Sequence, residues 1–236
     1  LECKKGKRTG FAVSFFFGGL LAAAVPVLNM AVRSANYLSI HASPVQILMN
    51  ANWQLMAMLN VLLAASGACL MYHIEYADGA ASKMCALPVR ESSIFFSKFA
   101  LMAVMCVEIL AIETAGILFC VVYWFEMSDE LWIELIKGFG YSVLLMLPAG
   151  LCALLIASAC RNMWVSLGIS VVCIFTATLL PTDHFILSLF PFALPFQMSS
   201  GMPEKTIYNF IIAALVEIAA IAAVKVTLLK GRRRLG

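Results

Sequence analysis

The chain has 236 residues, of which 63% are apolar and 12% charged, and its net charge is +3. A soluble domain averages roughly 45–50% apolar and about 25% charged residues, and one core could not bury this excess of apolar surface. The composition therefore excludes an ordinary soluble domain. The basic excess needs no nucleic-acid partner, because basic residues flank membrane spans beside anionic lipid headgroups.

The apolar residues fall in six blocks. A helix rising 1.5 Å per residue needs about 20 apolar residues to cross roughly 30 Å of hydrocarbon. We therefore predict an all-α integral membrane protein with six transmembrane helices, forming a single transmembrane domain over residues 1–236. The predicted spans are 11–32, 53–72, 94–124, 139–160, 163–182 and 207–229.

The basic residues predict the orientation, since they concentrate on the cytoplasmic side of a membrane. Both termini are predicted to be cytoplasmic, and only Arg33, Lys137 and Lys205 fall on the outer side. The remaining 13 of the 16 basic residues are predicted inside: Lys4, Lys5, Lys7, Arg8, Lys83, Arg90, Lys98, Arg161, Lys225, Lys230, Arg232, Arg233 and Arg234.

Residues 1–10 are basic, and they are predicted either to lie along the inner interface as an entry segment or to form a plain charged flank. The following apolar run is longer than the roughly 7–15 residues of a signal-peptide core, so we expect this span to be retained. Pro26 is expected to kink it. The chain begins with Leu1 rather than Met, so we expect further residues upstream.

Signals of catalysis or metal binding do not occur in the sequence. No cysteine lies in a predicted outer loop, and no Cys/His spacing indicates a metal site. The chain has no phosphate-binding GxxxxGK[ST] motif and no HExxH motif. Ser66 has no mid-membrane histidine as a base, and beside Gly67 it is more typical of close helix packing. We predict no catalytic residue, no metal ligand and no cofactor in this chain.

The predicted cytoplasmic loop over 73–93 is the longest polar interval on the inner side. Apolar residues recur at helical spacing from Ala77 to Leu87, which predicts a short amphipathic helix. Pro88 ends it, because a residue before proline disfavours helical geometry. Taken alone, this helix is a connector along the inner membrane surface.

The outer side is predicted to hold polar loops over 33–52 and 125–138, with Trp124 and Trp132 as interface anchors. The segment 183–206 differs, because three prolines and four phenylalanines make it too apolar for a free loop and too broken for a span. We predict a re-entrant or interfacial hairpin before the sixth span, with a membrane-hugging loop as the equal alternative.

Three acidic residues fall inside predicted spans: Glu108, Glu113 and Glu217. An acidic residue at the membrane centre costs about 2.5–3.5 kcal/mol, so each should face protein or water. Glu108 and Glu113 lie about 140° apart around their helix and do not share a face. These residues either hydrogen-bond to polar side chains of neighbouring spans or line a route for a cationic or polar substrate.

The whole pattern resembles the permease subunit of a type-2 ATP-binding-cassette (ABC) exporter, and is most similar to the permeases of lantibiotic immunity and bacitracin efflux. The shared features are the basic entry segment, six spans with both ends inside, and the proline-broken outer segment. The loop also matches, through Glu75, Lys83, Met84, the run Leu87-Pro88-Val89-Arg90, and Lys98.

The resemblance implies that a separate cytoplasmic ATPase, which holds the ATP and Mg²⁺, docks on the helix over 77–88 and switches the permease between two packings. Two permease chains, identical or different, would form the pathway in the bacterial cytoplasmic (inner) membrane. The implied cargo is an antimicrobial peptide of the lantibiotic type or a similar amphiphile. The implied coupling residues are Glu75, Asp78, Lys83, Met84, Leu87, Pro88 and Arg90.

Two other classes were compatible with parts of the sequence. The substrate-binding membrane subunit of a vitamin importer is also small, six-spanned and without a nucleotide site. An intramembrane enzyme is disfavoured because no base lies at the depth of Ser66. A cassette ATPase encoded beside this chain would favour the exporter permease.

Overall fold

The structure is a computed structural model, and it describes residues 10–77, 91–126, 130–160, 162–180 and 185–235. Side chains are not described for 75–77, 91 and 230–235. Every regular element within these ranges is helical, which confirms the predicted all-α class.

Six helices form the body of the described part of the chain, and a short helix and a 3₁₀ turn lie before the last of them. Five of the six are long and apolar enough to cross a membrane, and α7, with 17 residues, is shorter. At 1.5 Å per residue α7 spans about 26 Å, slightly less than the hydrocarbon thickness. The elements are α2 (Phe11–Leu38), α3 (Pro44–Ala77), α5 (Glu91–Trp124), α6 (Leu131–Ala159), α7 (Met163–Leu179), α8 (Phe185–Ser188), η1 (Leu194–Phe196) and α9 (Glu204–Leu235).

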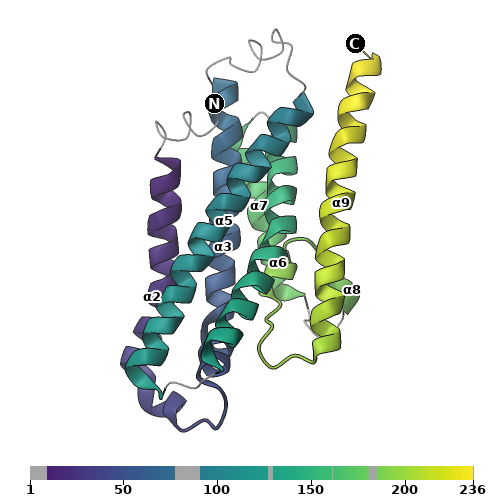
Figure 1. Cartoon of the computed structure of the whole chain (residues 1–236). Helices are drawn as coiled ribbons and strands as arrows, with labels where there is room; N and C mark the ends of the chain where they lie inside the picture. Colours follow the sequence, from purple (N-terminus) through teal and green to yellow (C-terminus); the bar gives the residue numbers. More distant parts are fainter. Residues whose placement is uncertain (1–9, 78–90, 127–129, 161, 181–184, 236) are drawn as a thin grey trace.

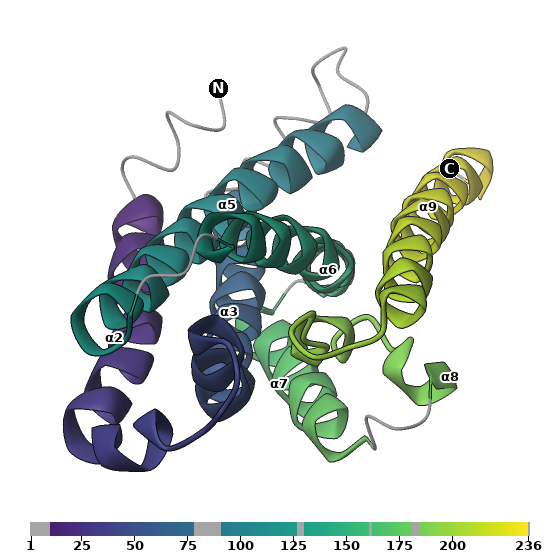
Figure 2. The same cartoon turned by 60° about the horizontal axis from the view of Figure 1, so that its bottom comes forward.

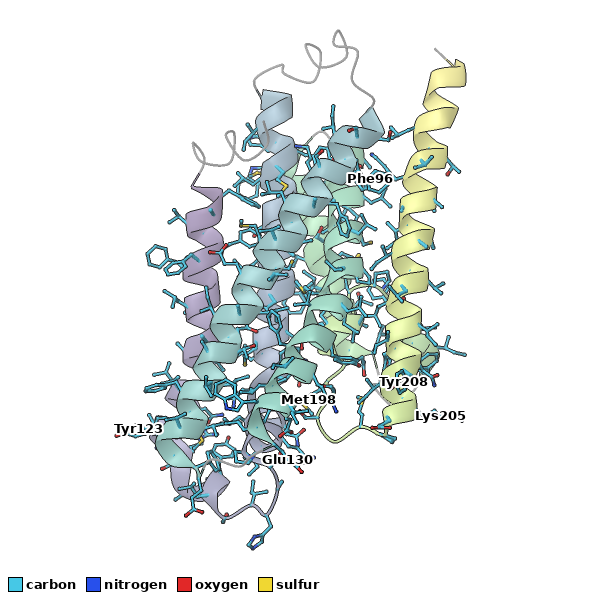
Figure 3. All side chains as sticks on the ribbon, viewed as in Figure 1. Phe96, Tyr123, Glu130, Met198, Lys205 and Tyr208 are labelled. Carbon is cyan, nitrogen blue, oxygen red and sulfur yellow. The ribbon has the colours of Figure 1, made fainter. Side chains whose placement is uncertain are left out.

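The long helices run roughly side by side, so the bundle has two ends (Figure 1). The start of α2, the end of α3, the start of α5 and the end of α9 share one end, which we call the inner end after the predicted orientation. Figure 3 shows Phe96 near this end, and Glu130 and Lys205 at the opposite, outer end. Figure 2 shows α9 at the edge of the bundle, where it packs mainly on α6.

The first outer loop is much shorter than predicted. α2 continues to Leu38 and α3 already begins at Pro44, so the connection covers 39–43 rather than 33–52. The backbone of α2 leaves helical geometry at Arg33 (φ −130°, ψ 26°) and stays helical through Pro26, where the kink was expected. A hydropathy window selects only the apolar residues that lie in the hydrocarbon. It therefore misses the polar turns by which a helix extends beyond the membrane core.

The second outer loop is also wrong in its extent, since α6 begins at Leu131 instead of near residue 139. Glu134 therefore lies in the first turn of a helix, and its Oε1 accepts a hydrogen bond of 2.9 Å from Ser43 Oγ. The same Oγ accepts from the backbone N–H of Gln46 at 3.2 Å, which caps the start of α3. These bonds connect the outer ends of α3 and α6.

Small residues bring α2 close to its neighbours. A Cβ added to Gly116 of α5 would lie 3.0 Å from Ala23 Cβ, and one added to Gly67 of α3 would lie 2.6 Å from Phe15 Cζ. Gly67 thus makes the close helix contact expected at the Ser66-Gly67 pair. Ser66 itself is exposed, and its hydroxyl donates to the carbonyl of Leu63.

The outer segment between α7 and α9 is packed into the protein, and Figure 1 shows α8 beside the outer part of α9. Phe192 and Leu194 are buried, and η1 contacts both α3 and α6. Trp53 of α3 holds it directly, because its indole Nε1 donates a 3.1 Å hydrogen bond to the carbonyl oxygen of Pro195.

We expect Trp53→Phe to loosen this segment. The change keeps most of the buried ring but leaves the Pro195 carbonyl without its donor, a loss of about 1–3 kcal/mol for a buried polar group. The expected result is faster labelling of a cysteine placed at Met198 by a membrane-impermeant maleimide. Trp132→Phe is the control, because Trp132 is about half exposed. Equal labelling in the wild-type and Trp53→Phe backgrounds would contradict the predicted role of the bond.

Candidate functional site in the membrane

The predicted coupling residues fall almost entirely outside the described part of the chain. Asp78, Lys83, Met84, Leu87, Pro88 and Arg90 lie in the undescribed stretch 78–90, and Glu75 lies on the last turn of α3 without a described side chain. The predicted entry segment over 1–9 is likewise outside the described residues. The structure does describe both helices that flank the loop, and these end together at the inner end (Figure 1).

Lys98 joins these two helices. It was expected as an inner flanking charge, yet only 1% of its surface is exposed. Its Nζ donates to the carbonyl oxygen of Met71 on α3 at 3.2 Å and lies 5.0 Å from the centre of the Tyr72 ring, within the range of a cation–π interaction. A signal for this burial was present: Phe95, Lys98 and Met102 share one helical face, and both apolar neighbours are buried,.

Lys225 makes a similar connection for α9. Its Nζ donates a 2.7 Å hydrogen bond to Ser158 Oγ on α6 and lies 4.9 Å from the centre of the Phe95 ring on α5. Because α9 is attached here to two helices, and α5 is attached to α3 through Lys98, the inner end forms one connected unit next to the predicted coupling loop.

The acidic residues of α5 have different surroundings, as their separation around the helix predicts. Glu108 is half-buried, whereas Glu113 is only 1% exposed. Glu113 Oε2 accepts a 3.0 Å hydrogen bond from Asn60 Nδ2 of α3. Glu113 Oε1 and Asn60 Oδ1 are buried acceptors without a hydrogen-bond partner among the residues described.

A second polar pair lies nearer the start of α3. Asn29 of α2 donates from Nδ2 to Asn52 Oδ1 at 2.8 Å, and Asn52 Nδ2 donates to the carbonyl of Leu48. Buried polar groups in a membrane are stable when they hydrogen-bond to one another. The Asn29–Asn52 pair therefore links α3 to α2, and the Asn60–Glu113 pair links α3 to α5.

Glu217 lies on α9 and is half-buried. Both carboxyl oxygens are buried and have no hydrogen-bond partner within the described ranges. Glu217 is therefore an acidic residue inside a predicted span, on the helix that packs against α6. It lies on a different helix from both members of the Glu113–Asn60 pair.

A pocket lies between α3, α5 and α6 in the outer half of the bundle. Glu113 lines it together with residues close to the outer end, including Glu134 in the first turn of α6. Glu113 lies eleven positions before Trp124, where α5 ends, which corresponds to about 16 Å along the helix. The other polar residues that line the pocket are Thr114, Ser142 and Ser200.

These features define a multi-pass helical membrane protein with polar residues inside its bundle and a connected inner end. Residues 1–177 match the family described as ABC-2 family transporter protein. The chain belongs to this family and is an ABC-transporter permease, a membrane subunit that is not itself catalytic. No curated protein and no solved structure matches the chain.

Proposed function

We propose that this permease expels a cationic amphiphilic peptide of the lantibiotic or bacitracin type from the bacterial cytoplasmic membrane, driven by a separate ATPase subunit. The family match over residues 1–177 carries the transporter part of this proposal. That range includes the loop over 78–90 and both of its flanking helices. The cargo is proposed from the resemblance described for the sequence.

The loop over 73–93 is proposed as the surface on which the ATPase docks. Its flanking helices, α3 and α5, are joined by the Lys98–Met71 bond, and α5 contacts Lys225 of α9. A displacement of the loop would therefore move several helices together, which is what a switch between two packings requires. ATP and Mg²⁺ would be held by the partner alone.

Two permease chains, identical or different, are proposed to form the complete pathway. Within each chain Glu108, Glu113 and Glu217 are the candidate pathway residues, because each places a carboxyl group inside a predicted span. Carboxylates at this depth are typical of routes for cations as well as of structural hydrogen bonds. Of these three residues, Glu113 lines the pocket that also contains Glu134 near the outer end, and Glu108 and Glu217 do not line it.

The proposed function is tested by producing the chain together with its proposed ATPase subunit, sought first in the adjacent gene, in a bacterium sensitive to lantibiotics and bacitracin. We expect a several-fold higher inhibitory concentration for one of these peptides. The control replaces the phosphate-binding lysine of the ATPase, which should abolish the gain. Unchanged sensitivity to every peptide, with both subunits present in the membrane, would refute the proposed cargo class.

A further inference from the structure

We propose that the pocket between α3, α5 and α6 binds a primary ammonium group through Glu113. The ammonium group enters the pocket from the outer end, past Glu134. Binding itself follows from the pocket, and only the assignment of the amine to the expelled cargo rests on the proposed function. The bound group would be the end of a lysine-like side chain or of another alkylamine.

The geometry of the pocket gives it an entrance and a floor. Glu134 lies in the first turn of α6, and Ser142 lies eight residues further along the same helix, about 12 Å deeper at 1.5 Å per residue. Glu113 of α5 lines the same pocket. A carboxyl group therefore lies at the entrance, and a second, almost fully buried one lies further inside.

The hydrogen bonds of Glu113 leave one of its two carboxyl oxygens, which is itself buried, without a donor among the described residues. Asn60 Nδ2 donates to Oε2, while Oε1 has no partner in the part of the chain that is described. A buried acceptor without a donor is costly, and a buried carboxylate without a cation costs several kcal/mol more. A ligand that brings both an N–H donor and a positive charge would offset both costs.

An ammonium group fits this arrangement better than other cations do. A guanidinium prefers both oxygens of one carboxylate, and here Oε2 is already bonded to Asn60. Ca²⁺ needs six to eight oxygen ligands, but in the described ranges no group of three or more acidic, His or Cys side chains could hold a metal ion. An ammonium needs only one free carboxylate oxygen and further hydroxyl acceptors, which Thr114 and Ser142 supply.

Aromatic side chains also line the pocket, and these suit an alkylammonium. Trp53 and Phe139 contribute to its walls, and the faces of aromatic rings attract cations. Trp53 is 7% exposed and is held by its bond to Pro195, so its ring is fixed before a ligand arrives. The enclosed space is about 20 Å³, which is room for one ammonium-sized group. The ammonium would therefore lie inside beside Glu113, and its alkyl chain would extend past Glu134 toward the outer end.

The test uses the full chain in phosphatidylcholine nanodiscs and calorimetric titration with hexylammonium. We expect saturable binding to the wild type and a loss of about tenfold or more in affinity for Glu113→Gln, equivalent to about 1.4 kcal/mol. Hexan-1-ol lacks the charge, and trimethylhexylammonium lacks the N–H donors. Each should bind to the wild type at least about tenfold more weakly than hexylammonium does. Equal binding of hexan-1-ol would mean partition into an apolar site and would overturn the proposal.

Two further variants separate the site from the general stability of the fold. Gly138→Leu leaves Glu113 and Asn60 in place but adds a side chain to the pocket wall, where a Cβ has no neighbour closer than Ser199 Oγ at 3.8 Å. It should also abolish hexylammonium binding. Glu126→Gln is the matched control, because Glu126 is exposed just beyond the end of the same helix and does not line the pocket, and it should bind as the wild type does. Wild-type affinity in Glu113→Gln or Gly138→Leu would refute the site.

The outcome is separable from that of the proposed function, because the titration needs no ATPase. A chain that binds hexylammonium but confers no peptide resistance supports the site and refutes the cargo class. A chain that confers resistance yet binds no hexylammonium refutes the site alone.

Discussion

Replacing Glu75 and Arg90 together by alanine is expected to reduce the amount of ATPase that co-purifies with this chain by about tenfold or more. The two residues flank the predicted coupling helix, and charged residues at the centre of a docking surface commonly carry much of the binding energy. Because the double change removes one acidic and one basic side chain, it leaves the net charge of the loop unaltered. The measurement is pull-down of the tagged permease from solubilised membranes, with the ATPase quantified by immunoblot.

The matched control for this experiment is Glu130→Ala with Lys137→Ala. Glu130 and Lys137 are one acidic and one basic residue, both exposed, and Figure 3 shows Glu130 at the outer end. The control should retain the ATPase as the wild type does. Full retention by the Glu75 and Arg90 variant, with normal amounts of permease in the membrane, would show that the ATPase docks elsewhere.

The helical class and the approximate places of the six helices followed from composition, because lipid imposes long apolar blocks. Their ends did not follow. Pro44 and Leu131 begin helices well before the predicted spans begin, since backbone hydrogen bonds continue through polar turns that no hydropathy window selects. The structure replaced two predicted outer loops by shorter connections for this reason.

The partners of the buried polar groups were even less accessible to sequence analysis. That Glu113 and Glu108 face different directions follows from helical geometry alone. Glu113 bonds to Asn60, which lies 53 residues away in the sequence. This pairing depends on which helices are neighbours, and a single sequence does not specify the neighbours of each helix. The same holds for the Lys98–Met71 bond, although the helical spacing of Phe95, Lys98 and Met102 already indicated a buried face.

The contact between α2 and α5 is expected to be the most sensitive packing contact in the protein. A Cβ at Gly116 would lie 3.0 Å from both Cβ and the backbone oxygen of Ala23. A backbone atom cannot rotate away as a side chain can, so Gly116→Leu must separate the two helices. Membrane helices without a hydrophobic drive to associate depend on such close small-residue contacts.

We therefore expect Gly116→Leu to lower the apparent Tm of the purified permease by roughly 2–12 °C, since overpacking a tight contact costs about 1–3 kcal/mol. The measurement is thermal loss of the monodisperse peak in size-exclusion chromatography. Gly140→Leu is the control, because a Cβ at Gly140 of α6 meets nothing within 4 Å, and the variant should melt close to the wild type. If both leucine variants melt alike, the approach of α2 to α5 does not limit stability. If only Gly116→Leu melts early, this contact holds α2 on the bundle.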